Sequence, residues 1–222
     1  MQNSANLSFF RVIFIFSLFI MASCKKSPIE DLKEAQFCLN SAPAAQAKAC
    51  LEKIASDTSP QAYELRCASE FIADNKDIAS LLTAMNSIKG APTTAGAIES
   101  LKFSSTTIAS SAFDQCTKSG IEIYAQISSI FNISTIASNA AGGDILTQVN
   151  NIPPATLGEI ALTTYTAACT GDATTSDATA VYCNQVKNAV AVNSSDPTAI
   201  GTCLQYLLTG VGAAPSGCVV PP

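Results

Sequence analysis

Two residue types are absent from this chain of 222 residues, which contains no histidine and no tryptophan. Histidine is the commonest general base in enzymes, so its absence excludes Ser-His-Asp and Cys-His catalytic arrangements. The absence of tryptophan, with only 7% aromatic residues overall, leaves no evident stacking platform for carbohydrate. The sequence therefore excludes the most frequent hydrolase chemistries.

Charged residues are also scarce. Only 13% of the residues are charged, and 17 Asp and Glu outnumber 12 Lys and Arg, which gives a net charge of −5. After Lys118 the only basic residue is Lys187, and the C-terminal half is instead rich in Ala, Ser and Thr. Binding to a phosphate backbone requires clustered basic side chains. We therefore expect no nucleic-acid partner.

Several short motifs that mark chemistry are missing as well. The chain has no G-x-x-x-x-G-K-[ST], G-x-G-x-x-G or G-x-S-x-G sequence, which removes the usual phosphate-binding loops and the nucleophile elbow. It has no C-x-x-C pair, and without histidine a zinc site would need four distant cysteines. We expect neither a metal site nor a cofactor.

Carboxylates are the remaining candidates for catalysis. A glycosidase needs two carboxyl groups on either side of a sugar, and Glu64 with Glu70, or Glu30 with Glu34, are close in sequence. These residues fall in predicted helices beside Lys and Arg, where surface pairing between residues four apart explains them. Glu30 is also explained as a helix-cap partner. A histidine-free, carboxylate-based enzyme such as a glycan-cleaving hydrolase stays as an alternative.

The N-terminal segment has the three parts of an export signal. Residues 1–23 contain a polar start with Arg11, an apolar stretch over 12–22, and small residues at the end. The stretch is shorter than the roughly 20 residues that span a bilayer. The tetrad Met21-Ala22-Ser23-Cys24 resembles the lipobox of bacterial lipoproteins. That resemblance implies cleavage before Cys24, a diacylglycerol on its thiol, and acylation of the new amino terminus.

The same resemblance predicts an address and a membrane contact. Lys25 follows the lipidated cysteine, where an Asp would retain an enterobacterial lipoprotein at the inner membrane, so the outer membrane is favoured. Residues 24–27 form a short tether before the first predicted helix, which begins at Pro28. The domain should therefore sit close to the bilayer, which suits a partner that is also an envelope protein. The leaflet stays open.

Cysteine usage fits an exported protein. Apart from Cys24, the chain has eight cysteines, an even number that predicts up to four disulfides in an oxidising compartment. The eight are Cys38, Cys50, Cys67, Cys116, Cys169, Cys183, Cys203 and Cys218. In an antiparallel helix pair, residues equally far from the turn lie at the same height, so a bridge should be centred on a loop.

This midpoint argument favours two bridges. Cys50 with Cys67 is centred on the predicted turn at 58–59, and Cys169 with Cys183 is centred on Ser176 in a predicted loop. If both form, Cys38 with Cys116 and Cys203 with Cys218 are left by elimination. Other pairs also satisfy the argument: Cys183 with Cys203 is centred on Asn193, and Cys203 with Cys218 lies near Gly210.

Helix-start signals recur along the chain. Ser27-Pro28, Ser59-Pro60 and Asp196-Pro197 each place a capping residue before proline at the first helical position. Apolar residues follow at helical spacing, and no comparable strand alternation appears, although the Ile-rich stretch 121–137 could form a strand. The predicted helices span 28–40, 43–56, 60–73, 77–88, 93–102, 105–118, 121–138, 156–169, 177–191 and 197–209.

These signals predict an all-α domain over 28–222, built as an array or bundle of about ten short antiparallel helices and stabilised by disulfides. Turn-forming residues between 140 and 155 are the best boundary if it has two subdomains. The succession of helix pairs resembles helical-repeat scaffolds of the tetratricopeptide and Sel1-like kind. The resemblance is architectural only, because the W-x-x-L-G-x-x-Y core and a period of about 34 residues are missing.

Together these features predict a non-catalytic, lipid-anchored envelope protein that acts as a binding, scaffold or assembly-factor module. Its expected partners are the membrane, through the lipid on Cys24, and an envelope protein. An alternative is a surface protein that faces outward and contacts host or neighbouring cells. The interaction hypothesis predicts an exposed apolar patch or groove between helices.

Overall fold

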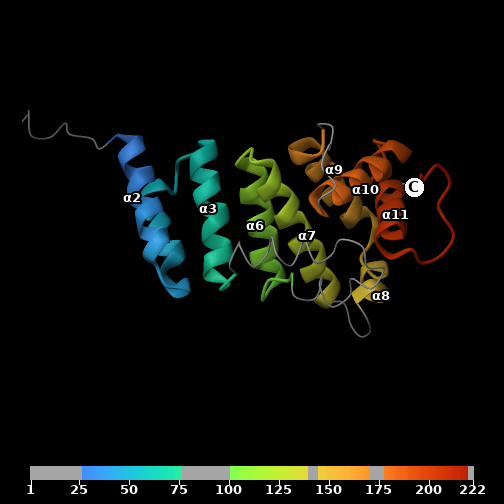
Figure 1. Ribbon diagram of the computed structural model, residues 1–222, viewed down its shortest axis with the longest axis horizontal. Coiled ribbons are helices and arrows are strands. Elements are labelled where there is room, and N and C mark those ends of the chain that lie inside the picture. The colour runs from blue at the N-terminus through green and yellow to red at the C-terminus, as the bar shows by residue number, and fades with distance from the viewer. Residues whose placement is uncertain (1–26, 77–100, 140–144, 171–177, 220–222) are drawn as a thin grey trace, which may run out of the picture.

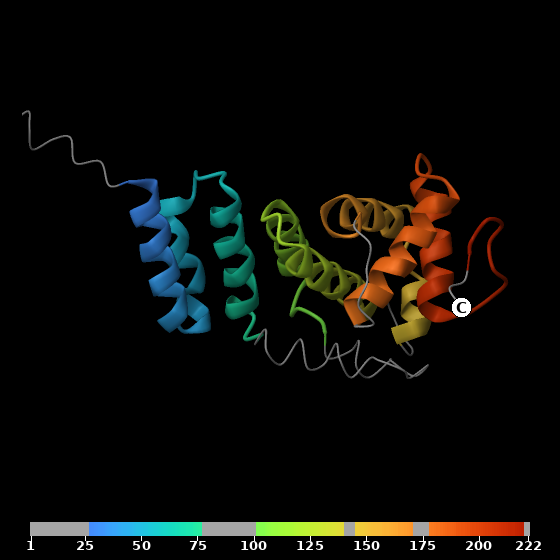
Figure 2. The ribbon, with the colours of Figure 1, turned by 45° about the horizontal axis from the view of Figure 1, so that its top comes forward.

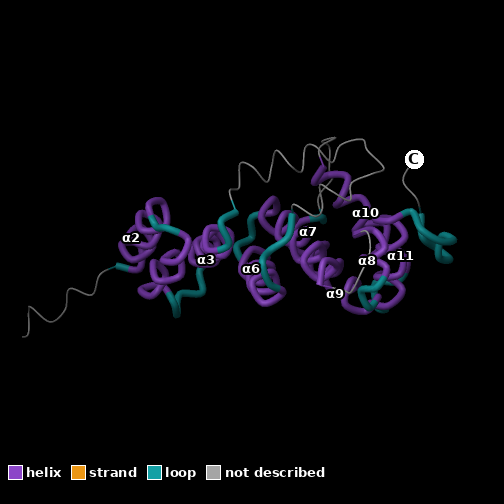
Figure 3. The backbone as a smooth tube through the Cα atoms, turned by 90° about the horizontal axis from the view of Figure 1, so that it is seen from below, coloured by secondary structure: helices purple, strands orange, loops and turns teal. Residues whose placement is uncertain are grey.

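The computed structural model describes residues 27–76, 101–139, 145–170 and 178–219. Within these ranges the chain is all-helical and has no strand, as predicted (Figures 1 and 3). The helices are α2 (Pro28–Ser41), η2 (Ala44–Ile54, a 3₁₀ helix), α3 (Pro60–Ala73), α6 (Thr106–Lys118), α7 (Glu122–Asn139), α8 (Ile145–Asn150), α9 (Pro154–Ala168), α10 (Ala178–Val192) and α11 (Pro197–Thr209).

The predicted helix starts are confirmed by their caps. The hydroxyl of Ser27 accepts a hydrogen bond from the backbone N–H of Glu30, and Ser59 accepts one from Ala62, both at 3.3 Å. Asp196 caps α11 in the same way, and each cap precedes proline. Such caps contribute about 1 kcal/mol each.

The predicted helix 121–138 is confirmed as α7, so the Ile-rich stretch does not form the alternative strand. Other details differ from the sequence prediction. The region 44–54 is a 3₁₀ helix, and α8 was not predicted because its short sequence lies between turn-forming residues. The predicted helix 77–88 and most of 93–102 lie outside the described residues; residues 101 and 102 are not helical.

The helices form an elongated array that follows the chain (Figures 1 and 2). Helices α2, η2 and α3 pack together at one end, α6 and α7 occupy the middle, and α8 to α11 form the other end. Helix α3 packs on α6, α6 on α7, and α7 on α9. A division into two subdomains stays a prediction.

The closest helix crossing is between α9 and α11. A Cβ atom added at Gly158 would lie 1.8 Å from the backbone oxygen of Pro197, and one at Gly201 would lie 1.7 Å from that of Pro154. Each glycine comes four residues after the proline that opens its helix, so the two contacts mirror each other. Only residues without a side chain permit this approach.

Four disulfides link the helices. They join Cys38 to Cys50, Cys67 to Cys116, Cys169 to Cys183 and Cys203 to Cys218, with Cα–Cα distances of 4.8 to 5.6 Å. The last two are the pairs that the sequence favoured or left by elimination. The predicted bridges Cys50–Cys67 and Cys38–Cys116 are wrong.

The reason lies in the faces of α3 and η2. Cys67 is buried on the side of α3 that packs on α6, in a cluster with Phe71 and Cys116. It therefore points toward α6 and not toward η2. The midpoint of Cys38 and Cys50 is Ala44, next to the turn between α2 and η2, so this bridge also satisfies the midpoint argument. The sequence prediction instead centred the bridge of Cys50 on the following turn, at 58–59.

Candidate functional site

A cleft of about 330 Å³, lined mainly by residues with polar or charged side chains, opens between η2, α3 and α6. We call it the η2–α3–α6 cleft. Helix η2 contributes one wall, and α3 and α6, which the Cys67–Cys116 bridge holds together, contribute the others. Its lining residues are Lys48, Leu51, Glu52, Ala55, Arg66, Ser69, Glu70, Ser111 and Gln115.

Glu70 is the central side chain of this cleft. Only 6% of the residue is exposed, although it carries a carboxylate. Oε1 accepts a hydrogen bond of 2.7 Å from the hydroxyl of Ser111, and Oε2 lies 2.9 Å from Nζ of Lys48. The Lys48 side chain is 58% exposed, so the buried carboxylate is neutralised by a cation that stands largely in water.

Two buried oxygens of the cleft have spare hydrogen-bonding capacity. Oε2 of Glu70 meets Lys48 as an ion pair but accepts no hydrogen bond of favourable geometry within the described residues. Oε1 of Gln115 is also buried without a partner there, while its amide nitrogen donates to Asp114 at 3.1 Å. Leaving a buried acceptor unpaired costs free energy, so the Gln115 oxygen favours a donor brought by a ligand or water. Oε2 of Glu70 is already paired with Lys48 and can accept from one further donor.

Arg66 forms the rim of the cleft and closes the end of η2. Its Nη2 donates to the backbone oxygens of Ala55 at 3.0 Å and Asp57 at 2.6 Å, and its guanidinium lies 5.1 Å from the ring centre of Tyr63. The backbone N–H of Ser59, followed by its hydroxyl, lowers the pKa of Asp57. These contacts fix the wall that carries Lys48.

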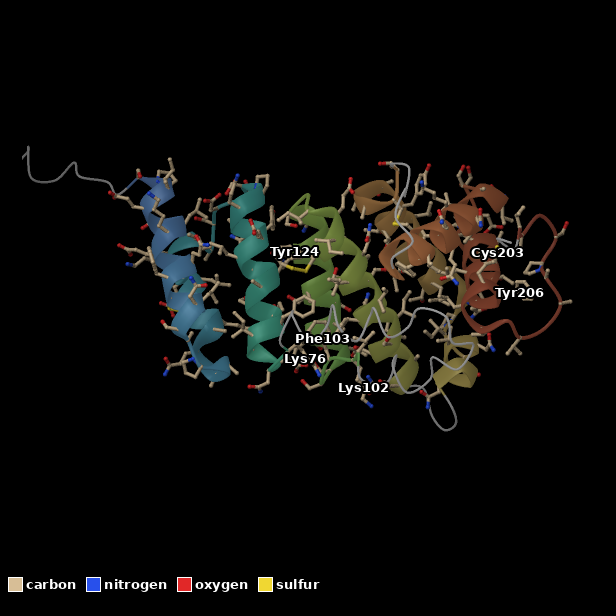
Figure 4. The ribbon with its side chains drawn as sticks, in the orientation of Figure 1. Lys76, Lys102, Phe103, Tyr124, Cys203 and Tyr206 are labelled. Carbon is tan, nitrogen blue, oxygen red and sulfur yellow. A yellow bond between two sulfur atoms is a disulfide. The ribbon has the colours of Figure 1, made fainter. Side chains whose placement is uncertain are left out.

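The α3–α6 junction continues past the cleft into an aromatic cluster. Tyr124 lies beside the sulfur bridge, and Phe103 lies further down the junction, near Lys76 (Figure 4). The rings of Phe71, Phe103 and Phe131 are 5.0 to 5.5 Å apart, at tilted and edge-on angles that favour aromatic contact. This cluster packs α3 against α7 and the segment that leads into α6.

A second polar cluster is buried in the C-terminal half. The hydroxyl of Ser129 on α7 lies 2.7 Å from that of Tyr182 on α10 and accepts from Thr164 on α9 at 2.8 Å. Burial raises the pKa of Tyr182 to about 12, against the effect of both hydroxyls. These hydroxyls satisfy one another, so the cluster ties three helices together.

The carboxylates singled out from the sequence are not brought together. Glu70 lines the cleft, but Glu64 does not, and the other acidic lining residue is Glu52, which sequence reasoning missed. Glu34 forms an ion pair with Lys53 of η2. Glu30 is exposed at the start of α2. The site draws on three helices, and no sequence spacing signals that.

The described residues contain no group of three or more Cys, Asp or Glu side chains arranged to bind a metal. None of their helices, including the 18-residue α7, is long and apolar enough to cross a membrane. Cys24, the expected lipidation site, lies outside the described residues.

An apolar surface lies on α2, away from the cleft. Phe37 is 74% exposed, the highest value among the large apolar residues described. Ile29 is 63% exposed, which is also among the highest of these values. Lys33 is exposed between them. We call Ile29, Lys33 and Phe37 the outer face of α2.

Comparison of the chain with protein-family models, with curated proteins and with solved structures finds no match. The likeness to helical-repeat scaffolds therefore depends on the succession of helix pairs alone. The η2–α3–α6 cleft and the outer face of α2 have to be interpreted from their own chemistry.

Proposed function

We propose that this protein is a non-catalytic, lipid-anchored protein of the bacterial envelope that binds a protein partner through the η2–α3–α6 cleft. The observation that carries this proposal is Glu70, a buried carboxylate in an open cleft whose counterion, Lys48, is mostly in water. A buried charge is costly unless it is well paired, so a site of this kind favours a cationic group that replaces the solvated Lys48 at the carboxylate.

The cleft suits a basic side chain from the partner. Lys48 is on a flexible stem and mostly exposed, so it can move aside while an incoming Lys or Arg pairs with Oε2 of Glu70. An N–H group of the same partner can donate to the buried oxygen of Gln115. Glu52, on the exposed part of the lining, is a second carboxylate that can pair with a basic side chain of the partner.

The anchor is supported by the sequence and by the cysteines. Residues 1–23 have the form of an export signal, and the tetrad before Cys24 resembles a lipobox. The other eight cysteines form four bridges, which persist in exported proteins and are rare in reducing compartments. Lys25 after the acylated cysteine favours the outer membrane.

Site-specific crosslinking tests the binding proposal. A photoreactive amino acid placed at Glu52 should give one discrete protein adduct in intact envelopes, whereas the same group at Thr202, exposed on α11, should not. Glu70→Gln should reduce the Glu52 adduct at least about fivefold, because removing the charge removes roughly 1 kcal/mol or more of pairing. Equal adducts from both positions, or an adduct insensitive to Glu70→Gln, would refute the proposed site.

The anchor has its own test. Labelled palmitate should be incorporated into the wild-type chain and lost in Cys24→Ser. Continued labelling of Cys24→Ser would overturn the assignment of Cys24. Protease added to intact cells then reports the leaflet, because only an outward-facing protein is digested.

A further inference from the structure

The outer face of α2 is an apolar surface at the end of the molecule. Helix α2 packs against η2 and α3, and its buried residues Ala35 and Leu39 face them. Phe37 is two residues from each, which in a helix places it on the opposite side. The outer face of α2 therefore closes one end of the array (Figure 2).

The chain before α2 limits how far this face can lie from the proposed anchor. Cys24 precedes Pro28 by four residues, and a fully extended chain spans at most about 3.6 Å per residue. The Cα atom of Pro28 therefore lies within about 14 Å of that of an acylated Cys24, whatever the conformation between them. A lipid on Cys24 brings the first turn of α2 to the headgroup layer.

The chemistry of the face fits that layer. An interfacial helix presents apolar side chains to the acyl boundary and basic side chains to anionic headgroups. Ile29 and Phe37 supply the first and Lys33 the second. Of the acidic residues on α2, Glu34 is paired with Lys53 and Asp31 is half-buried. Glu30 is exposed on the same side of the helix as Phe37, seven residues away, and its charge balances that of Lys33.

A second protein is a poorer match for this face. A stable interface buries about 800 Å² on each partner. Two large apolar side chains, separated by Lys33, do not supply a dry centre of that size. A bilayer needs no such area, because the lipid on Cys24 already holds the helix there.

We infer that the outer face of α2 lies on the surface of a lipid bilayer, with Phe37 and Ile29 inserted among the lipids and Lys33 at the headgroups. This inference rests on the proposed acylation of Cys24. The helix then lies in the membrane plane, and the array stands on the bilayer by its α2 end. The η2–α3–α6 cleft is held near the membrane, with α11 farthest from it.

The chain has no tryptophan, so a single introduced one reports its own position without background. The acylated protein carrying Phe37→Trp is reconstituted into vesicles of phosphatidylethanolamine and phosphatidylglycerol with brominated acyl chains. We expect a blue-shifted emission that bromine quenches at least about twofold. The matched control is Val211→Trp, 59% exposed beyond α11 at the opposite end, whose emission should stay unquenched.

The outcomes separate the two proposals. If the acylated protein binds the vesicles but the emission of Phe37→Trp is as unquenched as that of Val211→Trp, the docking of α2 is refuted and the anchor is not. A chain that gains no lipid overturns both. Adding Lys33→Glu to Phe37→Trp should weaken quenching in anionic vesicles but not in vesicles of phosphatidylcholine, and equal quenching in both would contradict the role of Lys33. Both substituted side chains are exposed, so the fold is retained.

Discussion

Gly158→Ala gives a sharp test of the crossing between α9 and α11. In an exposed helix interior, replacing Gly by Ala stabilises a protein by about 1 kcal/mol because Ala has the higher helix propensity. At Gly158 the new Cβ would lie 1.8 Å from the backbone oxygen of Pro197. The neighbour is backbone, so no side-chain rotation relieves the clash.

The size of the effect follows from the distance. An ordinary contact needs 3.4 Å or more, so α9 and α11 must separate by about 1.6 Å, far beyond the few tenths of an ångström that a packed core absorbs. The separation disturbs Leu157 and Ile200, both fully buried beside the crossing. Overpacking of this kind costs up to about 3 kcal/mol. After the propensity gain, we expect a net loss of about 2 kcal/mol.

Urea unfolding of the oxidised protein measures this loss. Thr163→Ala, on the exposed side of α9, is the matched control and should stabilise by about 0.5 kcal/mol. In the double variant Gly158→Ala with Gly201→Ala, the loss should fall short of the sum by about 1 kcal/mol, because one separation of α9 from α11 relieves both clashes. A Gly158→Ala protein as stable as the control would refute the close crossing.

Three further predictions concern stability. Replacing Cys67 and Cys116 together by alanine opens a loop of 49 residues and should lower the free energy of unfolding by about 4 kcal/mol. Urea unfolding of the otherwise oxidised protein measures this loss, and a loss below about 1 kcal/mol would show that the bridge does not form. Tyr182→Phe should cost about 1 kcal/mol through the lost hydroxyl contact. In the wild type the pKa of Tyr182 is raised to about 12, so the contribution of this group to the unfolding free energy is constant below about pH 10 and falls from there to pH 12. Ultraviolet titration should show a late-ionising tyrosine, and its absence would contradict the burial of that ring. Ser111→Ala removes a hydrogen bond to the buried Glu70 and should cost about 2 kcal/mol, with no comparable loss expected if the carboxylate is solvated instead.

The sequence predicted most of the secondary structure because its signals are local. Ser59 before Pro60 and Asp196 before Pro197 mark helix starts that depend on a few neighbouring residues, and both are found. Apolar spacing then placed the helices that lie within the described residues, with end shifts of at most two residues. Helix α8 was not predicted, because six residues are too few to show the helical spacing of apolar residues.

Packing between helices could not be predicted in the same way. The faces of α3 decide whether Cys67 meets η2 or α6, and apolar residues occur on both sides of that helix, so spacing alone pointed to the wrong partner. The cleft presents the same difficulty. Lys48, Glu70 and Gln115 lie on three helices, and only the assembled structure brings them together.

The bridge between Cys67 and Cys116 also changes what the intervening chain has to do. Because α3 and α6 are joined covalently, residues 77–100 are not needed to keep the two helices connected. A protease cut within 77–100 leaves one covalent molecule, which separates into two fragments only on reduction.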